Sequence, residues 1–358
     1  MNALRLGLIG SGNIAGAHLK AAPHVPQWAQ FVAIASPHEA NRQRQSARFN
    51  IARSYADPAE LLAAPDIEGV VICTPHDTHA ELARRCCAAG KHVLVEKPMA
   101  CSLAECDAMI AAAQAAGTTL MVAQCQRFDP AYRGLKRILD AGELGPVRAV
   151  RIDAMQNAAA FVPPDHWYLD ARRAGGGIVI SVAIHKLDLV RYLIGDVVRV
   201  TAACRTISPL FRHGAEDYAV ATLEFANGAV GQLFATWSAF RLPYSENLMI
   251  FGDDGAVHAL PPGETQMGPA LVASRQRTPP AVPGFAGQFG GFTPVESDGT
   301  GLPAADPFAN QLAHFVECCR TGAEPLSGGN DNRKTMAVVF AIYESAHTGL
   351  PAPVKILP

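Results

Sequence analysis

The segment that most constrains the fold lies near the start of the chain. Six mostly apolar residues, 4–9, lead directly into the turn Gly10-Ser11-Gly12, and a helical pattern follows. A strand, a glycine turn and a helix in this order are the context that a dinucleotide-binding fingerprint requires. Gly10 allows the sharp turn, Gly12 lets the backbone approach a pyrophosphate, and Ala15 permits close packing of the helix on the strand. The free N–H groups of the helix start attract phosphate, so we expect a bound dinucleotide rather than a purely structural turn.

Strands and helices continue to alternate after this segment. Further buried strands are expected at Phe31–Ala35, Gly69–Cys73, His92–Val95 and Leu120–Ala123, with helical patterns between them. A repeated strand–helix order predicts a parallel, doubly wound sheet with helices on both faces. We therefore assign residues 1–124 to a dinucleotide-binding Rossmann domain of the α/β class.

The pattern changes after residue 146. Strands are now expected at Val147–Met155, Val197–Ile207, Asp217–Phe225, Ala229–Trp237 and Asn247–Phe251. Asn227-Gly228 predicts a type I′ hairpin between two of them, and Asp254-Gly255 predicts another hairpin. Few helices separate these strands, so we expect residues 125–358 to form an α+β domain on a large, open, mostly antiparallel sheet that binds the substrate. An uncovered sheet face is typical of a subunit interface, which predicts a homodimer or homotetramer.

Two stretches near the end of the chain differ in composition. Residues 260–303 are rich in proline and glycine and are expected to form a long loop, with a short strand-like piece at Leu271–Ser274. Helical patterns return at Pro307–Arg320 and Arg333–Thr348. Gly349 then ends the last helix.

The overall composition excludes several classes of protein. A length of 358 residues suits two domains, and a net charge of -2 provides no basic surface for nucleic acid. No apolar run is long enough to cross a bilayer, and Met1-Asn2-Ala3 leaves no room for a secretory signal before the first strand. The nine cysteines contain no C-x-x-C or zinc-ligand spacing. We expect a cytoplasmic protein with reduced thiols, and neither nucleic acid nor a membrane as partner.

The end of the second strand bears on the choice of cofactor. An acidic residue here holds the ribose 2′-hydroxyl of NAD, but this chain has Ser36-Pro37-His38. Without a carboxylate, a 2′-phosphate is not repelled, and Arg42 supplies positive charge nearby. An exposed helix face is the other explanation of that arginine. We expect NAD(P), with NADP mildly favoured.

Two more loops follow strand ends. Thr74-Pro75-His76 and His79 come after the third expected strand, and Glu96-Lys97-Pro98 comes after the fourth. The carboxyl ends of parallel strands line a cofactor crevice, and we prefer this role to a metal site for the two histidines. A charged pair that ends a buried strand favours a functional site over a surface salt bridge. Lys97-Pro98 is also a candidate cis bond.

A helix in the second half carries the other candidate residues. Three glycines, 175–177, precede the stretch Ile178–Ile194, which is apolar almost all round and is predicted to be a buried helix. Ser181, His185 and Asp188 fall at spacings of four and three, on one helical face. A satisfied core histidine is the plain alternative to a functional one. The glycines favour a site because they allow close approach of a ligand or another backbone, and a histidine suits proton transfer with a hydroxyl.

Together these motifs resemble the Gfo/Idh/MocA family, which includes glucose–fructose oxidoreductase and inositol dehydrogenase. The resemblance rests on GSGNIA near the start, EKP at 96–98, QRFDPAY from Gln126 and GGGIVISVAIHKLDLVRYLIG from Gly175, and the chain's ending is similar as well. It covers nearly the whole chain apart from residues 260–303. It implies an N-terminal Rossmann domain, a C-terminal domain on a large open sheet, and oxidation of a hydroxyl or reduction of a ketone on a sugar or cyclitol.

The resemblance also implies roles for individual residues. Lys97 would lie beside the nicotinamide and polarise the substrate oxygen, and His185 would be the general acid or base. The family often has an aspartate four residues before that histidine, where this chain has Ser181, and Asp188 would take over part of its role. The cofactor-binding residues are expected to be Gly10, Gly12, Asn13, Ile14, Ser36, His38, Arg42, Thr74, Pro75, His76, His79, Glu96, Lys97, Gln124, Arg127 and Trp167. The expected substrate-binding residues are Gln126, Gln156, Asp170, Ser181 and Tyr244.

Two other functions remain open at this point. A glycosidase that uses bound NAD transiently would hold its cofactor tightly and show no net redox change. A non-catalytic protein that binds a dinucleotide and senses a sugar is compatible with Ser181. The motifs favour an NAD(P)-dependent dehydrogenase or reductase that acts on CH–OH groups of a sugar or polyol.

Overall fold

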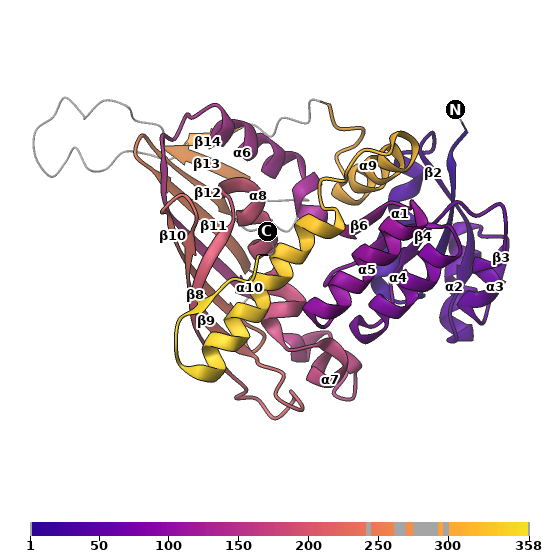
Figure 1. The fold of residues 1–358 in the computed structure, drawn as a ribbon, viewed down its shortest axis with the longest axis horizontal. Coiled ribbons are helices and arrows are strands. Elements are labelled where there is room, and N and C mark those ends of the chain that lie inside the picture. The colour runs from indigo at the N-terminus through magenta and orange to yellow at the C-terminus, as the bar shows by residue number, and fades with distance from the viewer. Residues whose placement is uncertain (1, 241–244, 261–269, 275–292, 296–300, 357–358) are drawn as a thin grey trace, which may run out of the picture. The chain divides into compact units, whose positions relative to one another are not determined.

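A computed structural model describes residues 2–240, 245–260, 270–274, 293–295 and 301–356 (Figure 1). The chain divides into two compact units. The first comprises Met1–Phe128, Arg172–Gly175 and Gly301–Met336, and the second comprises Asp129–Ala171, Gly176–Thr300 and Ala337–Pro358. Among the described residues, no helix combines the length and apolar character that a membrane span needs.

The first unit is built on a six-stranded sheet in the order β3-β2-β1-β4-β5-β6, and all neighbouring strands are parallel. Strand order therefore reverses between β1 and β4, as in a doubly wound sheet. This confirms the fold class predicted for the first part of the chain. The strands are β1 Leu4–Ile9, β2 Ala29–Ala35, β3 Arg53–Tyr55, β4 Gly69–Ile72, β5 His92–Glu96 and β6 Leu120–Ala123.

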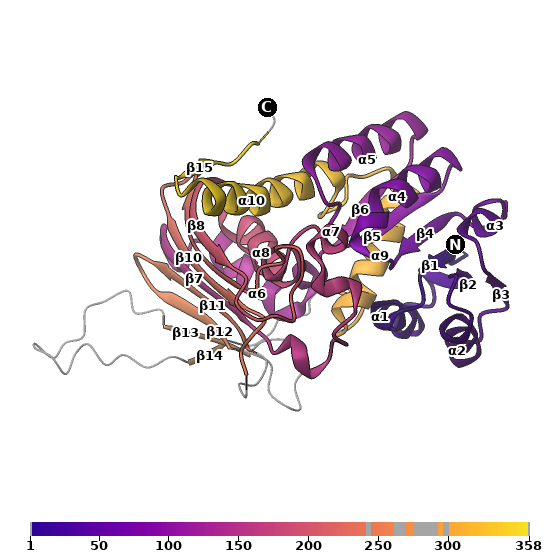
Figure 2. The same ribbon diagram turned by 90° about the horizontal axis from the view of Figure 1, so that it is seen from below.

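Helices cover both faces of this sheet. Helices α4 and α5 lie side by side on one face, and α1 and α9 lie on the other (Figure 2). Leu6 and Leu8 of β1 pack with Leu312 and Phe315 of α9 in one buried cluster. The helices are α1 Asn13–Ala21, α2 Glu39–Phe49, α3 Pro58–Leu62, α4 His79–Ala88, α5 Leu103–Ala116 and α9 Pro307–Thr321.

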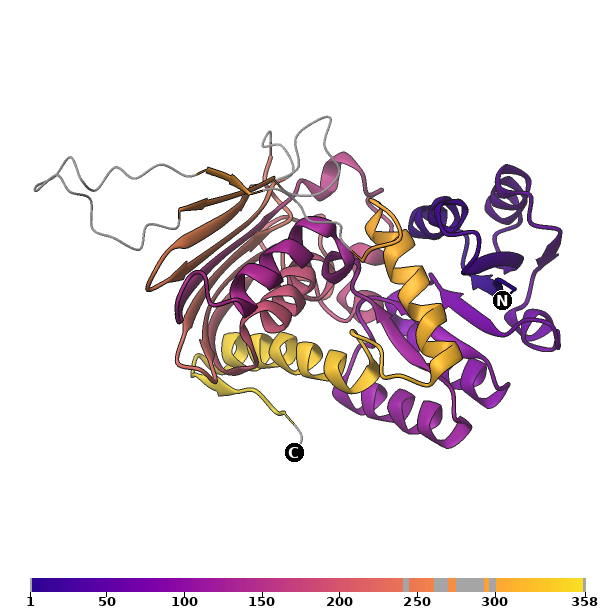
Figure 3. The same cartoon turned by 90° about the horizontal axis from the view of Figure 1, so that it is seen from above.

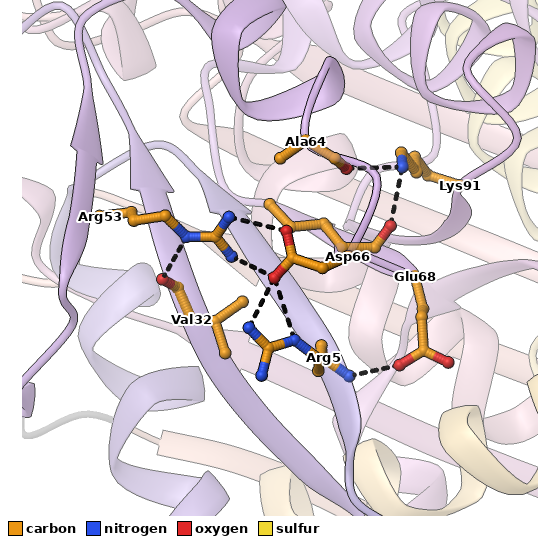
Figure 4. A network of polar contacts seen from close by, with 8 residues as sticks. Arg5, Val32, Arg53, Ala64, Asp66, Glu68 and Lys91 are labelled. Carbon is orange, nitrogen blue, oxygen red and sulfur yellow. Dashed lines mark hydrogen bonds and ion pairs between the residues drawn. The ribbon is translucent and has the colours of Figure 1, made fainter.

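A network of charged residues holds the amino-terminal end of the same sheet together (Figure 4). Arg53 donates two hydrogen bonds of 2.8 Å to Asp66, and Arg5 of β1 donates to the same carboxylate. The ammonium group of Lys91, just before β5, donates to the carbonyl oxygens of Ala64 at 3.0 Å and Ile67 at 2.8 Å. These contacts fix the segment that leads into β4, at the end of the sheet opposite the predicted site.

The second unit is built on a nine-stranded sheet in the order β14-β13-β12-β11-β7-β10-β9-β8-β15. Neighbouring strands are antiparallel except for β7 and β10, so the expected open, mostly antiparallel sheet is confirmed. The strands are β7 Val147–Met155, β8 Val197–Arg205, β9 Tyr218–Phe225, β10 Val230–Thr236, β11 Ser245–Gly252, β12 Ala256–Leu260, β13 Ala270–Ser274, β14 Thr293–Val295 and β15 Ala352–Pro353.

One face of this sheet is covered by helices. These are α6 Pro130–Asp140, α8 Ile184–Ile194 and α10 Gly329–Thr348, of which residues from 337 onward belong to this unit (Figure 3). Ala219, Ala221 and Leu223 of β9 are buried, whereas Val220 between them is 46% exposed. Because side chains alternate along a strand, Val220 lies on the opposite face, which the described residues leave open.

One local prediction was wrong, and another, the buried helix, was right but missed a local irregularity. The loop between β9 and β10 is not a type I′ turn, because only Gly228 has a positive φ, of 84°, and Asn227 does not. Gly228 donates to the carbonyl of Phe225, and Phe225 donates to Ala229, which is the three-residue loop with a left-handed glycine that also joins hairpins. The second difference is in the stretch Ile178–Ile194, where the structure has a π-helix, Val179–Ala183, before α8 begins.

Candidate active site

The carboxyl ends of five parallel strands bring most of the predicted cofactor-binding residues to one edge of the first sheet. Each loop follows its strand directly: residues 10–12 follow β1, 36–38 follow β2, 73–79 follow β4, 97–98 follow β5 and 124–127 follow β6. In an open parallel sheet this edge, at the point where strand order reverses, is where ligands bind.

The glycine turn has the geometry that a pyrophosphate needs. Gly10 has a φ of +104°, and a Cβ there would lie 2.3 Å from the carbonyl oxygen of Cys73, so only glycine fits. Gly12 precedes the first residue of α1, and a Cβ at Gly12 would meet no protein atom within 4 Å. Gly12, Asn13 and Ile14 are exposed, and no described side chain caps the helix. The start of α1 is therefore open, and it fits a bound phosphate group.

The end of β2 carries a hydroxyl and a guanidinium in place of an acid. Ser36 is 2% exposed, and its Oγ lies 2.8 Å from the Oγ of Ser11 in the glycine turn. Arg42 donates to the Ser36 carbonyl oxygen at 2.5 Å and to the Ser54 hydroxyl at 2.9 Å. His38 is exposed beside them. This charge distribution favours an anion more than an acidic residue at position 36 would.

Two buried histidines hold the loop after β4. The Nδ1 of His76 lies 2.9 Å from the carbonyl oxygen of Ala174, and burial lowers the pKa of His76 well below its ordinary value. The two ring nitrogens of His79 lie 2.8 Å from the Pro98 oxygen and 2.9 Å from the Thr74 oxygen. Both carbonyls receive a hydrogen bond only when both ring nitrogens of His79 carry a proton, which makes the ring a cation. Burial acts against this charged form, because it lowers the pKa of His79. Within the described ranges, no group of three or more potential metal ligands occurs.

The turn after β5 is the most tightly held part of this edge. Glu96 is 5% exposed, and its Oε1 lies 2.7 Å from Nε2 of His18 on α1. Its Oε2 accepts the backbone N–H of Lys97 at 3.2 Å. The Lys97-Pro98 bond is cis, as predicted. Glu96 is thus a buried residue and not half of a surface salt bridge.

His18 was missed in the sequence, although a signal for it exists. It lies three residues after Ala15 and one before Leu19, both of which are buried, so its side chain points into the same helix–sheet interface. A buried histidine needs a polar partner, and Glu96 is a buried acid at the end of a neighbouring strand.

Two of the predicted residues after β6, Gln124 and Arg127, are deeply buried. Gln124 is 1% exposed, and both polar atoms of its side chain lack a hydrogen-bond partner among the described residues. Arg127 is 2% exposed, donates to the Leu326 carbonyl oxygen at 2.6 Å and forms an ion pair with Asp331 at 2.6 Å. Arg127 therefore ties the end of β6 to the segment before α10 through Leu326 and to the first turn of α10 through Asp331. Gln126 between them is partly buried.

In the second unit, His185 lies near the start of α8. From Gly176 to Arg191, a stretch that the structure describes in full, His185 is the one residue that is not buried. Ser181 lies in the π-helix and is 0% exposed, and Asp188 is 1% exposed. The hydroxyl of Tyr168 donates to the Ser181 carbonyl oxygen at 3.1 Å. Partial exposure distinguishes His185 from the fully buried residues around it, and π-helical turns are frequent at functional sites.

A buried acid holds the backbone just before this helix. Glu216 accepts the N–H groups of Gly177 at 2.7 Å and Val179 at 2.9 Å, and it accepts the Tyr343 hydroxyl at 3.0 Å. Burial raises the pKa of Glu216 to about 7. A Cβ on Gly177 would lie 2.0 Å from the backbone oxygen of Glu216. The glycines therefore allow the approach of another backbone, the second of the two explanations that the sequence left open.

On its buried side α8 is held by an ion pair. Lys186 is 1% exposed, and its ammonium lies 2.7 Å from Glu246 of β11 and 2.8 Å from the hydroxyl of Tyr132 on α6. Burial acts against the charged form, but the Glu246 carboxylate and the tyrosine raise the pKa of Lys186 overall. Lys186 thus binds the helix to the sheet one position after His185.

The remaining predicted residues are distributed over the second unit. Trp167 is partly exposed, with its ring 5.2 Å from that of Tyr168. Gln156 accepts the indole N–H of Trp237 at 3.3 Å. Asp170 is 8% exposed and lies 2.9 Å from Nδ1 of His213. Tyr244 lies outside the described residues.

The sequence matches two family models. Residues 4–124 match an oxidoreductase family with an NAD-binding Rossmann fold, and residues 132–258 match the GFO/IDH/MocA C-terminal domain.

Similar proteins of known name include a myo-inositol 2-dehydrogenase of Thermotoga maritima, 27% identical over 96% of both chains. A levoglucosan dehydrogenase of Pseudarthrobacter phenanthrenivorans is 30% identical over 72% of this chain and 73% of its own. Among solved structures, levoglucosan dehydrogenase with NADH and L-sorbose covers 100% of both chains with a TM-score of 0.88 and 26% identity. Aldose-aldose oxidoreductase from Caulobacter crescentus, with glycerol, has a TM-score of 0.85 and 28% identity, and the match covers 98% of this chain and 100% of that one.

Proposed function

This chain belongs to the GFO/IDH/MocA family of oxidoreductases with an NAD-binding Rossmann fold, and we propose that it transfers a hydride between NAD(P) and a secondary alcohol or ketone of a sugar, cyclitol or related polyol. Relatives with inositol, apiose, anhydrofructose and levoglucosan in their names support this substrate class.

One observation about exposure supports the proposal most directly. Lys97 is the single residue from Val93 to Ala100 that is not buried, and His185 is the single such residue from Gly176 to Arg191, both stretches being fully described. Burial of a polar side chain has a cost, so a lysine and a histidine that emerge from otherwise buried segments are available for contact with a ligand. Alcohol oxidation needs a proton acceptor and a group that stabilises negative charge on the oxygen, and an imidazole and an ammonium can serve as these.

The open start of α1 supports the binding of a dinucleotide cofactor. Gly10, Gly12, Asn13 and Ile14 would hold the pyrophosphate, and Ser36, His38 and Arg42 would lie at the adenosine ribose. The remaining predicted cofactor-binding residues would line the nicotinamide half, and the bound nicotinamide would supply the hydride acceptor or donor. The match to an NAD-binding family supports NAD(H). A preference for NADP is our proposal from Ser36 and Arg42.

The proposed roles of the protein side chains concern the substrate hydroxyl. His185 removes the hydroxyl proton during oxidation and returns it during reduction. The Lys97 ammonium donates a hydrogen bond to the same oxygen and stabilises the negative charge that develops on it. Asp188, one turn beyond His185, takes over part of the role of the aspartate that Ser181 replaces. Gln126, Gln156, Asp170, Ser181 and Tyr244 are proposed to select the substrate.

We extend the proposal to the division of the chain. Residues 1–124 would bind the cofactor, and residues 125–358 would bind the substrate and form the subunit contact. The open face of the nine-stranded sheet supports a homodimer or homotetramer, because Val220, Val230 and Phe251 on that face are 46%, 51% and 38% exposed. Aligned strand positions bring these side chains to the same face.

The proposal is tested with a panel of polyols and both cofactors. Wild-type protein is assayed for reduced nicotinamide with myo-inositol, scyllo-inositol, D-apiose and levoglucosan, each with NAD and with NADP. We expect turnover with at least one pair. Lys97→Ala should lower kcat by about a hundredfold to a thousandfold because the charge on the oxygen loses its stabilising donor. Calorimetry should show that this variant binds the cofactor within about threefold of wild type.

Two results would contradict the proposal. Wild-type turnover by Lys97→Ala would remove its catalytic role. Cofactor binding without turnover on a broad polyol panel would favour a sensing protein instead.

A further inference from the structure

We propose that His18 and Glu96 are a buried positioning pair, which holds the backbone of Lys97 so that its ammonium meets the substrate oxygen. The inference rests on the proposed function of Lys97. It adds His18, which comes from the helix that begins at the glycine turn, and it gives Glu96, so far proposed only among the cofactor-binding residues, a role in holding Lys97.

The contacts form a continuous connection from α1 to Lys97. Nε2 of His18 lies 2.7 Å from Oε1 of Glu96, and Oε2 of Glu96 accepts the Lys97 N–H at 3.2 Å. With a proton on Nε2, the ring donates this hydrogen bond to the carboxylate. The His18 ring meets Phe308 of α9 edge-on, with centroids 5.2 Å apart and an interplanar angle of 88°. That contact fixes the ring plane, and with it the direction of the hydrogen bond to Glu96.

A second imidazole holds the other side of the same turn. His79 of α4 lies 2.8 Å from the carbonyl oxygen of Pro98, the residue after Lys97. The backbone is therefore held before Lys97 through Glu96 and after it through Pro98, by histidines from two different helices. Between these anchors, the Lys97 side chain is the one that emerges from the buried segment.

Stability alone does not explain a buried histidine–glutamate pair at this position. His18 is 0% exposed and Glu96 5%, and a well-packed apolar pair of similar size usually stabilises a helix–strand contact at least as well. What an apolar pair lacks is an acceptor for the Lys97 N–H. The pair also connects Lys97 to α1, whose first residues are proposed to bind the cofactor. A displacement of about 1 Å at a reacting group can lower a rate about a hundredfold, so such positioning has a measurable effect.

Three variants separate positioning from packing. His18→Phe keeps an aromatic ring against Phe308 but has no donor for Glu96. His18→Gln keeps an N–H near the place of Nε2. Glu96→Gln keeps an acceptor but removes the charge. We expect kcat to fall about a hundredfold in His18→Phe, with KM and the Kd for NAD within about threefold of wild type, and to recover to within about tenfold in His18→Gln. Glu96→Gln should lie between these two.

A second measurement, which does not depend on turnover, is the NMR signal of the Lys97 backbone amide. The chain has seven lysines, so protein labelled with ¹⁵N-lysine gives few amide signals, and the Lys97→Arg variant identifies the one of interest. Loss of the His18 donor should shift the Lys97 amide signal, although His18 does not contact Lys97 directly. Lys91→Met is the matched control. Lys91 is a buried lysine just before β5, whereas Lys97 comes just after this strand, and the partners of Lys91 lie at the opposite end of the sheet. This variant should lower the unfolding temperature but leave kcat and the Lys97 amide unchanged.

The outcomes are distinct. The proposal is overturned if folded His18→Phe keeps kcat within about threefold of wild type, if its Kd for NAD weakens in proportion to the loss of kcat, or if the Lys97 amide does not shift. If His18→Phe does not fold, His18→Gln and Glu96→Gln decide by the same criteria. If wild type turns over no substrate, the proposed function fails, and the amide signal alone then decides whether the pair holds Lys97.

Discussion

Glu96 in the first unit and Glu216 in the second both hold the backbone near a proposed catalytic residue, but they do so through different contacts. Each is a buried carboxylate that accepts backbone N–H groups beside a proposed catalytic residue. Glu96 accepts the N–H of Lys97, the next residue, and its other oxygen is bound by His18. Glu216 accepts the N–H groups of Gly177 and Val179, shortly before His185, and is bound by the Tyr343 hydroxyl.

The difference lies in how far along the chain the accepted N–H groups are. Glu96 accepts the N–H of its own neighbour in sequence, and its other oxygen is bound by a side chain, that of His18, 78 positions away. Glu216 acts on residues 39 and 37 positions away and depends on a tyrosine 127 positions away. The first arrangement reaches a distant element through a side chain, whereas the second requires a close approach of two backbones. Glycine substitutions test this contrast most strongly.

Gly177→Ala is expected to cost more than about 4 kcal/mol of stability, or to prevent folding, because its Cβ would lie 2.0 Å from the Glu216 backbone oxygen. Gly12→Ala is the matched substitution in the first unit. No protein atom lies within 4 Å of a Cβ there, so the unfolding free energy without cofactor should stay within about 1 kcal/mol of wild type. Its methyl group would occupy the space of a pyrophosphate, and the Kd for NAD should weaken at least about tenfold.

Urea unfolding and calorimetric titration of the two alanine variants check this pair. Equal losses of stability would mean that the two glycine segments serve the same structural purpose. Wild-type NAD affinity in Gly12→Ala would remove the glycine turn from the proposed cofactor site.

The same contrast explains what the sequence alone could predict. The parallel sheet, the glycine turn and the cis Lys97-Pro98 bond depend on neighbouring residues, so their patterns are visible within a few positions. The partners of Glu216 and of Lys186 come from elements far along the chain, and no local pattern marks them. The π-helix and the three-residue hairpin loop were missed for this reason, because tertiary contacts decide between backbone conformations of similar energy.

Glu216 is expected to make the free energy of unfolding depend on pH in the range where ordinary carboxylates are already ionised. Burial raises its pKa to about 7 from an ordinary 4.5, so between these values the folded protein binds a proton that the unfolded chain releases. The free energy of unfolding should therefore fall as the pH rises from about 5 to about 7, by about 1–3 kcal/mol from this group, and level off above. Glu216→Gln should lack this fall. Urea unfolding of both proteins over this range measures it, and parallel curves for the two would contradict the assignment.

Asp66 differs from Glu96 and Glu216 because its carboxylate has strong hydrogen-bond partners but is not buried. Hydrogen bonds from Arg53 and then Arg5 hold the pKa of Asp66 well below its usual range, yet its side chain is 38% exposed. Water and salt screen such contacts, and the two arginines stay solvated when the carboxylate is removed. The contribution of Asp66 to stability therefore depends more on its exposure than on the number of its partners. Asp66→Asn should lower the unfolding temperature by no more than about 2 °C, and about 0.5 M salt should reduce that difference. Turnover should not change, because the network lies at the amino-terminal end of the sheet (Figure 4). A loss above about 5 °C that salt does not reduce would mean that Asp66, like Glu216, holds the backbone in a way that solvent cannot replace.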